Sequence, residues 1–166
     1  MDRVSARKIL LDTNAWVDYF DGGRPSHEKM LALVNRALGL GASLLYSVPS
    51  AKDIFYLMSS VYKSDYRREH AGVLSHAAAA AAAEMAWGCV DNMCEIATAV
   101  GCDQADVWLA RKRKRLHRDF EDNLVLSAAD RAKADLLVTN DDQLRRHAPV
   151  AAMSVADALS YLESLD

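Results

Sequence analysis

The stretch KILLDTNAW, residues 8–16, ends an apolar run at an acidic residue and continues at once with polar ones. We predict a short buried strand over residues 9–11 and a helix over residues 14–20, capped by Asp12, Thr13 or Asn14. A carboxylate at the end of a buried strand costs free energy unless a helix N-terminus or a bound cation compensates it. Asp12 is therefore the first candidate functional residue.

The composition is typical of a single domain, residues 1–166. Hydrophobic residues make up 51% of the chain and charged residues 26%. No apolar run approaches the length of a membrane span and no signal-peptide pattern is present, so we expect a soluble, cytoplasmic protein. The three cysteines, Cys89, Cys94 and Cys102, lack CxxC spacing, which disfavours a disulfide framework or a zinc site. We expect them to be reduced and mostly buried.

Hydrophobic periodicity predicts further strands over residues 43–48, 94–98, 135–139 and 150–154. Amphipathic helices are predicted between the strands and at the C-terminal end. One of them, over residues 66–88, contains seven consecutive alanines and is expected to be close-packed or to face a second copy in a homodimer. Buried strands alternating with helices predict an α/β fold with three layers, α/β/α, around a central parallel sheet of about five strands.

Four acidic residues are predicted near the edge of this sheet where the strands end. Asp12 follows the first strand, Asp53 lies in the first turns of the helix after the second, Asp122 lies near the start of the helix before the fourth, and Asp141 follows the fourth. Carboxylates gathered this closely repel one another, and divalent cations make such a cluster favourable at neutral pH. Oxygen ligands favour Mg²⁺ or Mn²⁺.

Each acid also has a purely structural interpretation. Asp12 and Asp141 are suited to cap the helices that follow them, and acids at the start of a helix favour its N-terminus, as Asp119, Glu121 and Asp122 would. It is less expected that four helix-capping acids would gather at one sheet edge by chance than that they form a metal site. We interpret Asp119 and Glu121 as structural or supporting residues.

The segments LLDTNAWVDYF, DFEDNLVLSAA and LLVTNDDQL, with the acidic helix after the second strand, resemble the PIN-domain family of metal-dependent ribonucleases in order and spacing. The resemblance extends from Lys8 to the final helix. By position it implies that Asp12, Asp122 and Asp141 are catalytic metal ligands. It further implies that three polar residues help to order the acidic site: Asn14, Thr139 and Asn140.

Asp53 departs from the family pattern, because it occupies the position where the family usually has glutamate. One fewer methylene shortens its reach by about 1.5 Å, the length of a C–C bond. The resemblance leaves two alternatives open: Asp53 is a catalytic metal ligand acting through water, or it is not a ligand.

The activity that the resemblance implies is hydrolysis of RNA phosphodiester bonds by one or two bound cations that lower the pKa of an attacking water. Small members of the family are commonly the toxins of bacterial toxin–antitoxin pairs, and others act in RNA maturation or decay. The expected partners are therefore an RNA substrate and a small antitoxin that covers the acidic groove, for example with an arginine among the carboxylates.

The run ARKRKRLHRDFED places seven basic or titratable side chains directly before the predicted catalytic helix, although the net charge of the whole chain is −3. Such a cluster would neutralise RNA phosphates near the acids, whereas the alternative is a solvated helix face. We interpret it as an RNA-binding patch. The residues of the predicted RNA-binding patch are Arg111, Arg113, Lys114, Arg115 and Arg118.

The three tryptophans, Trp16, Trp87 and Trp108, are expected to pack in the core or an interface rather than against bases.

Two other classes of function compete with the nuclease. The substitution at Asp53 is compatible with a non-catalytic RNA- or protein-binding module on the same fold. A phosphoaspartate enzyme would also place an acid after the first strand. It is disfavoured because Asn14 occupies the position where such enzymes need a second aspartate.

Overall fold

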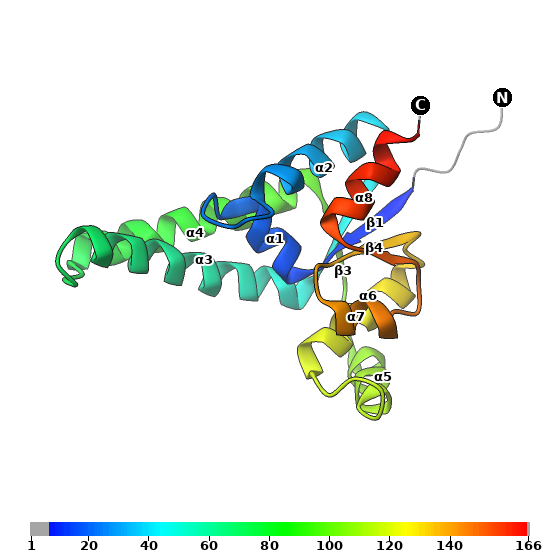
Figure 1. Ribbon diagram of the computed structural model, residues 1–166. Coiled ribbons are helices and arrows are strands. Elements are labelled where there is room, and N and C mark those ends of the chain that lie inside the picture. The colour runs from blue at the N-terminus through cyan, green and yellow to red at the C-terminus, as the bar shows by residue number, and fades with distance from the viewer. Residues whose placement is uncertain (1–6, 166) are drawn as a thin grey trace.

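The computed structural model describes residues 7–165, and within them it contains one parallel sheet of five strands (Figure 1). The spatial order of the strands is β3-β2-β1-β4-β5. The predicted α/β fold with a central parallel sheet is confirmed. The strands are β1 (Lys8–Leu11), β2 (Ser43–Ser47), β3 (Thr98–Val100), β4 (Leu136–Val138) and β5 (Ala152–Met153).

Helices cover both faces of the sheet, because successive strand residues point to opposite sides. In β1, Ile9 and Leu11 pack into one hydrophobic cluster with residues of α1, α2, α3, α4 and α8, whereas Leu10 packs into a second cluster with residues of α6 and α7. Three layers result. The helices are α1 (Thr13–Phe20), α2 (His27–Gly39), α3 (Val48–Glu69), α4 (His76–Ile96), α5 (Gln104–Arg113), α6 (Phe120–Ala132), α7 (Asp142–His147) and α8 (Val155–Glu163).

Two predicted elements were wrong in their bounds. The segment 94–98 was expected to be a strand, but α4 continues to Ile96 and β3 begins at Thr98, because Cys89 and Met93 bury one face of the helix at a spacing of four residues. The alanine-rich helix was expected to start near residue 66. Instead α3 ends at Glu69, and the chain turns through Ala71 and Gly72, both with positive φ, before α4 begins.

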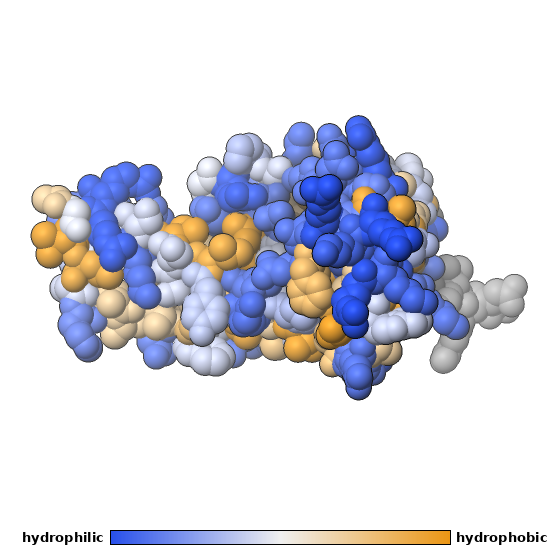
Figure 2. Space-filling view, turned by 90° about the horizontal axis from the view of Figure 1, so that it is seen from below, coloured by the Kyte–Doolittle hydropathy of each residue, from blue (hydrophilic) through white to orange (hydrophobic). Residues whose placement is uncertain are grey.

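The helices α3 and α4 pair side by side as an arm that extends away from the sheet (Figure 1). On α4, Ala82 and Ala86 are buried, while Met85 and Trp87 are half-exposed. Of the three tryptophans, which were expected in the core or an interface, Trp16 is buried in the core, whereas Trp87 and Trp108 are half-exposed and do not pack in the core. The view from the side of α5 shows hydrophobic side chains gathered on this arm and hydrophilic ones at the opposite end of the molecule (Figure 2).

All three cysteines are free thiols, but only Cys89 is buried, so the expectation that they are mostly buried was wrong. The thiols of Cys89 and Cys94 lie within hydrogen-bond distance of the hydroxyls of Tyr62 and Tyr46. Between residues 7 and 165, no helix combines the length and apolar character that a bilayer-spanning helix requires.

The strand order places a topological switch between β1 and β4. From β1 the chain passes through α1 and α2 to β2 on one side, whereas β4 lies on the other side of β1. In open parallel sheets, ligands bind at the carboxyl ends of strands next to such a switch. The backbone N–H of Asp12 donates to the carbonyl of Val138, 3.1 Å away, which ties the ends of β1 and β4 together at this point.

Ion pairs fasten α5 to α6. The carboxylate of Asp106 is buried, and its two oxygens accept hydrogen bonds from the Arg131 guanidinium at 3.1 and 2.8 Å. Arg131 also pairs with Asp103, the N-cap of α5. Further along α5, Arg113 donates to the Ser127 hydroxyl and pairs with Asp130. These contacts hold the basic segment of the chain rigidly against α6.

Replacing Arg131 with methionine should lower the free energy of unfolding, because it leaves the buried Asp106 carboxylate without its counter-ion. Urea denaturation measures the effect. Adding Asp106→Ala should recover part of the loss, since no unpaired charge remains. Arg146→Met on the exposed surface of α7 is the matched control. Equal effects of the two arginine substitutions would contradict the assigned role of Arg131.

Candidate active site

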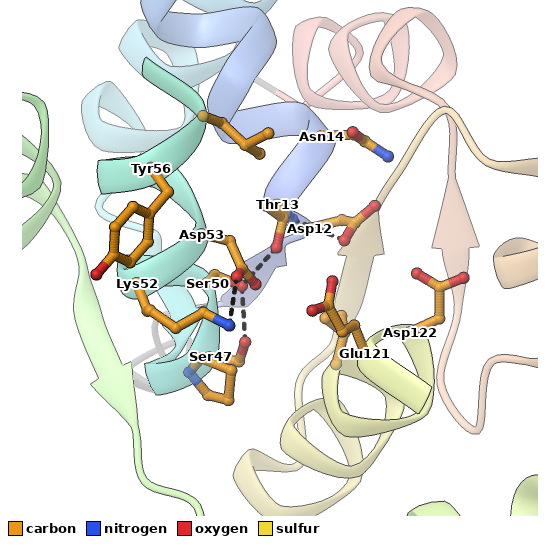
Figure 3. A pocket seen from close by; sticks show the side chains of 13 residues that line it. Asp12, Thr13, Asn14, Ser47, Ser50, Lys52, Asp53, Tyr56, Glu121 and Asp122 are labelled. Atoms are coloured by element: carbon orange, nitrogen blue, oxygen red, sulfur yellow. Dashed lines mark hydrogen bonds and ion pairs between the residues drawn. The ribbon is translucent and has the colours of Figure 1, made fainter. Parts of the chain in front are cut away.

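A pocket of about 410 Å³ opens at the carboxyl ends of the central strands (Figure 3). Side chains from three directions line it: from the end of β1 and the start of α1, from the first turns of α3, and from the start of α6. Three of the four predicted acids are among them, and Asp141 is not. The lining residues are Asp12, Thr13, Asn14, Ser47, Pro49, Ser50, Lys52, Asp53, Tyr56, Leu57, Glu121, Asp122 and Val125.

Asp12 lies at the base of the pocket and is only 2% exposed. It is the N-cap of α1, and its Oδ1 accepts a hydrogen bond from the backbone N–H of Thr13 at 2.6 Å. The hydroxyl of Thr139 donates to Oδ2 at 2.8 Å. Both partners are neutral donors, so the charge of this buried carboxylate is not paired with a cationic side chain within residues 7–165.

The segment after β4 supports Asp12 from the neighbouring strand. Thr139 is fully buried, and its hydroxyl oxygen also accepts from the backbone N–H of Asp141, 3.1 Å away. Asp141 caps α7 by accepting hydrogen bonds from two backbone N–H groups at the start of that helix. Asn140 turns instead toward Asp18 and Ser26, and its carbonyl oxygen accepts from a backbone N–H of α8. Its visible role is to join α1, α2 and α8.

Asp53 reaches the pocket from the second turn of α3, and its carboxylate is paired with a lysine. Lys52 Nζ lies 3.0 Å from Asp53 Oδ1, and the dashed lines of Figure 3 mark this contact. Hydrogen bonding to Asp53 raises the pKa of the Lys52 ammonium, which therefore stays protonated at neutral pH. At the base of the same helix, Ser50 accepts a hydrogen bond from the Thr13 hydroxyl and bonds to Ser47, which links β2, α3 and α1.

The start of α6 supplies the opposite wall of the pocket. Asp122 Oδ2 lies 2.6 Å from His117 Nε2, and the His117 ring lies 5.7 Å from that of His147 between the ring centroids. Glu121 faces Lys52 and Asp53 across the pocket in Figure 3. Asp119 is the N-cap of α6 and accepts from the backbone N–H of Asp122. The predicted structural role of Asp119 is therefore seen directly.

The electrostatics of the pocket disfavour the ionised form of two of the acids. Burial, with smaller contributions from the nearby carboxylates of Asp122 and Asp141, raises the pKa of Asp12 from 3.8 to about 6, although hydrogen bonds from Thr139 and Thr13 oppose the shift. Burial likewise raises the pKa of Asp122, with the hydrogen bond from His117 opposing the shift. The folded protein therefore carries a costly concentration of negative charge at neutral pH.

The donor set fits a hard divalent cation, because Asp12, Asp122 and Asp141 offer carboxylate oxygens only. Within residues 7–165, no three His, Cys, Asp or Glu side chains already form a metal-ligand group. Asp122 Oδ2 is hydrogen-bonded to His117, and Asp141 Oδ1 accepts from the N-terminus of α7.

The predicted RNA-binding residues divide into two groups. Arg111, Lys114 and Arg115 are exposed and line a second groove on the outside of α5. Arg118 is exposed in the loop before α6. Arg113 is different, because its guanidinium is engaged by Ser127 and Asp130 and holds α5 against α6. Its position favours a structural role over RNA contact.

Sequence reasoning missed two residues at the pocket. Lys52 was passed over, although its place next to Asp53 in the first turns of a predicted helix was a usable signal. His117 was included only as part of the basic run, and its pairing with Asp122 had no sequence signal beyond a separation of five residues.

Comparison with known proteins supports the fold. VapBC2 from Rickettsia felis, bound to a DNA fragment from its promoter, aligns over 89% of this chain and 98% of its own with a TM-score of 0.59 and 17% identity. VapBC-1 from nontypeable Haemophilus influenzae aligns over 90% and 98%, with a TM-score of 0.59 and 11% identity. VapC20 from Mycobacterium tuberculosis, a toxin that cleaves the sarcin–ricin loop, aligns over 83% and 93%, with a TM-score of 0.54 and 15% identity.

No curated protein matches the sequence of this chain. A family model described as PIN domain matches residues 8–143, which include β1 with Asp12, the start of α6 with Asp122, and the segment after β4 with Asp141. The identities to the solved structures are too low to show more than the common fold. The family match covers most of the chain and confirms the resemblance seen in the sequence: the chain belongs to the PIN domain family, a family of nucleases.

Proposed function

We propose that this protein is a Mg²⁺- or Mn²⁺-dependent endoribonuclease. One observation carries the proposal: the Asp12 carboxylate is buried at the switch between β1 and β4, accepts hydrogen bonds from two neutral donors, Thr13 and Thr139, and lies close to the charges of Asp122 and Asp141. A site of this kind costs stability in the free protein. A divalent cation offsets that cost and gives the cluster a chemical use.

Asp12, Asp122 and Asp141 would hold the cation, with Asp53 at the far side of the pocket. When bound, the cation lowers the pKa of a water molecule and polarises the scissile phosphate. Thr139 keeps the Asp12 carboxylate in place from β4, and His117 holds Asp122. The Lys52 ammonium, held at the pocket by Asp53, is placed to contact a phosphate oxygen of the substrate.

The likeness to VapBC complexes and to VapC20 supports a toxin as the biological role, in preference to an RNA-maturation or decay nuclease. A toxin requires a small antitoxin that blocks the pocket, and exposed apolar side chains on the α3–α4 arm offer surface for a partner or for a second copy in a homodimer. We assign the protein to the cytoplasm, where cellular RNA is the substrate.

A non-catalytic binding module is the second candidate, and the Lys52–Asp53 pair is the observation that favours it. Asp53 occupies the position of the family glutamate, and the Lys52 ammonium neutralises it without a metal. Such a module would bind RNA through its basic residues but would not cleave it.

Incubation with total cellular RNA and Mg²⁺ or Mn²⁺ should produce fragments with 5′-phosphate and 3′-hydroxyl ends. Asp12→Asn should reduce cleavage by more than about a hundredfold, because even groups that support metal ligands typically contribute 10–100-fold. Asp142→Asn is the matched control, since Asp142 pairs with Arg145 outside the pocket. Sequencing of fragment ends measures the result. Cleavage that persists in excess EDTA would contradict the proposal, and a folded, metal-loaded protein that cleaves nothing would favour the binding module.

Asp12→Asn should also stabilise the metal-free protein at pH 8 by about 2 kcal/mol. A pKa raised by about two units costs about 3 kcal/mol when the group is ionised, and the variant loses one hydrogen bond worth about 1 kcal/mol. The folded-state pKa is raised to about 6 from 3.8, so the stability that protonated Asp12 contributes is complete below pH 3.8 and is lost as the pH rises through 6. The advantage of the variant should therefore disappear below about pH 4. Urea unfolding across pH in EDTA measures it, and Mg²⁺ should stabilise only the wild type. A variant less stable at every pH would refute the assigned cost of the Asp12 charge.

Purification of the chain from its native cells should recover a small protein bound to it. The complex should fail to cleave RNA, and cleavage should appear after the partner is removed, because an antitoxin acts by covering the pocket. Native mass spectrometry and the cleavage assay measure the two effects. Recovery of free chain or homodimer alone, active as isolated, would argue against a toxin.

A further inference from the structure

The outer face of α5 carries a half-exposed tryptophan in a groove of cations, separate from the acidic pocket. This second cavity has a volume of about 510 Å³, and we call it the Trp108 groove. Trp108, Arg111 and Lys112 share one face of the helix at spacings of three and four residues. The lining residues are Trp108, Arg111, Lys112, Lys114 and Arg115.

The cations of the Trp108 groove are not neutralised by neighbouring acids. Asp103 and Asp106 are engaged by Arg131, and Asp130 is engaged by Arg113, on the side of α5 that faces α6. Across residues 7–165, none of the four cations that line the groove forms an ion pair with a carboxylate. The groove therefore presents concentrated positive charge to an anionic ligand.

Trp108 differs from the other exposed tryptophan in its surroundings. Their exposed fractions are nearly equal, 51% for Trp108 and 53% for Trp87. The Trp87 ring packs against Phe55, with 4.9 Å between the centroids. The Lys112 ammonium instead lies over the Trp108 ring, 3.6 Å from its centroid. About half of the Trp108 side chain is therefore exposed, and a cation lies over one face of its ring.

An exposed indole among lysines and arginines matches one kind of ligand closely: a nucleic-acid strand with an unpaired base. Such a base stacks on an aromatic ring while the flanking phosphates contact the cations. In a duplex the base faces are stacked inside the double helix. A duplex would therefore contact the cations through its phosphates but could not stack a base on the Trp108 ring. An acidic peptide would pair with the cations and gain nothing comparable from stacking.

We propose that the Trp108 groove is a docking subsite for an unpaired nucleotide of the RNA substrate, with the base stacked on Trp108. The proposal rests on the proposed function for the identity of the substrate as RNA. The segment 114–122 connects the groove directly to the acidic pocket, since Lys114 and Arg115 line the former and Asp122 lines the latter.

The groove is fixed in position relative to the acids. Arg113 and Arg131 fasten α5 to α6, His117 contacts Asp122, and the Asn123 side chain donates to the backbone carbonyl of His117 at 2.8 Å. A base held on Trp108 would therefore set which phosphodiester bond lies at the acidic pocket. The subsite selects RNA that is single-stranded at a fixed distance from the cleaved bond.

The test is a titration of the full-length protein with a short single-stranded oligoribonucleotide in excess EDTA, which separates binding from cleavage. Intrinsic tryptophan fluorescence should be quenched, and Trp108→Ala should abolish most of the quenching and weaken binding by about tenfold, the usual effect of removing one base–aromatic stack. Trp108→Phe should restore most of the affinity, since its ring also stacks. Trp87→Ala is the matched control and should bind like the wild type, with the quenching retained.

Three results would overturn the proposal: equal affinity of Trp108→Ala and wild type, equal quenching by a duplex of the same sequence, or equal quenching by a glutamate-rich peptide. The last result would assign the groove to an acidic partner. Urea unfolding of Trp108→Ala verifies that the fold is intact, which is expected for an exposed side chain. The metal-dependent cleavage assay tests the nuclease proposal separately. If the wild type cleaves RNA and Trp108→Ala binds RNA as tightly as the wild type, the subsite is refuted and the nuclease proposal stands.

Discussion

The buried charge of Asp12 is the constraint on which the rest of the site depends. Its carboxylate lies at the end of β1 against β4, and of residues 7–165 only Thr13, through its backbone, and Thr139, through its hydroxyl, donate hydrogen bonds to it. Neutral donors reduce the cost of burying an ionised group but do not remove it. Repulsion from Asp122 and Asp141 adds to that cost. The fold is thus destabilised locally at the point where a cation would stabilise it, which is a common arrangement at functional sites.

The helix α6 organises the surroundings of that charge. Its first turn brings Glu121 and Asp122 to the pocket, while its later residues Ser127, Asp130 and Arg131 anchor α5. One rigid element therefore connects an acidic pocket with a basic surface. The acidic residues of α5, Asp103 and Asp106, form ion pairs with Arg131 of α6. They therefore do not neutralise the cations on the outer face of α5, which can bind a polyanion.

Much of the fold was predictable because local patterns determine it. Apolar runs marked four of the strands, and the residues after β1 and β4 marked the sheet edge that carries the pocket. The third strand was misplaced because Cys94–Thr98 is short and apolar enough to suit either a strand or a helix end, and packing of Met93 decides between them. The turn at Gly72 was missed because the alanine run after it, residues 77–83, strongly favours a helix, and the residues before it are also helical.

The sequence by itself determined the strand–helix alternation, the PIN domain family and the order of the four acids along the chain, because strand and helix periodicity and helix caps are local properties. Only the tertiary structure decided which side chains meet. It joined Ser50 of α3 to Thr13, turned Arg113 of α5 inward onto Ser127 of α6 and left Trp108 exposed. These outcomes depend on how α3, α5 and α6 pack on the sheet, and such contacts between segments distant in the chain leave no periodic signal in the sequence.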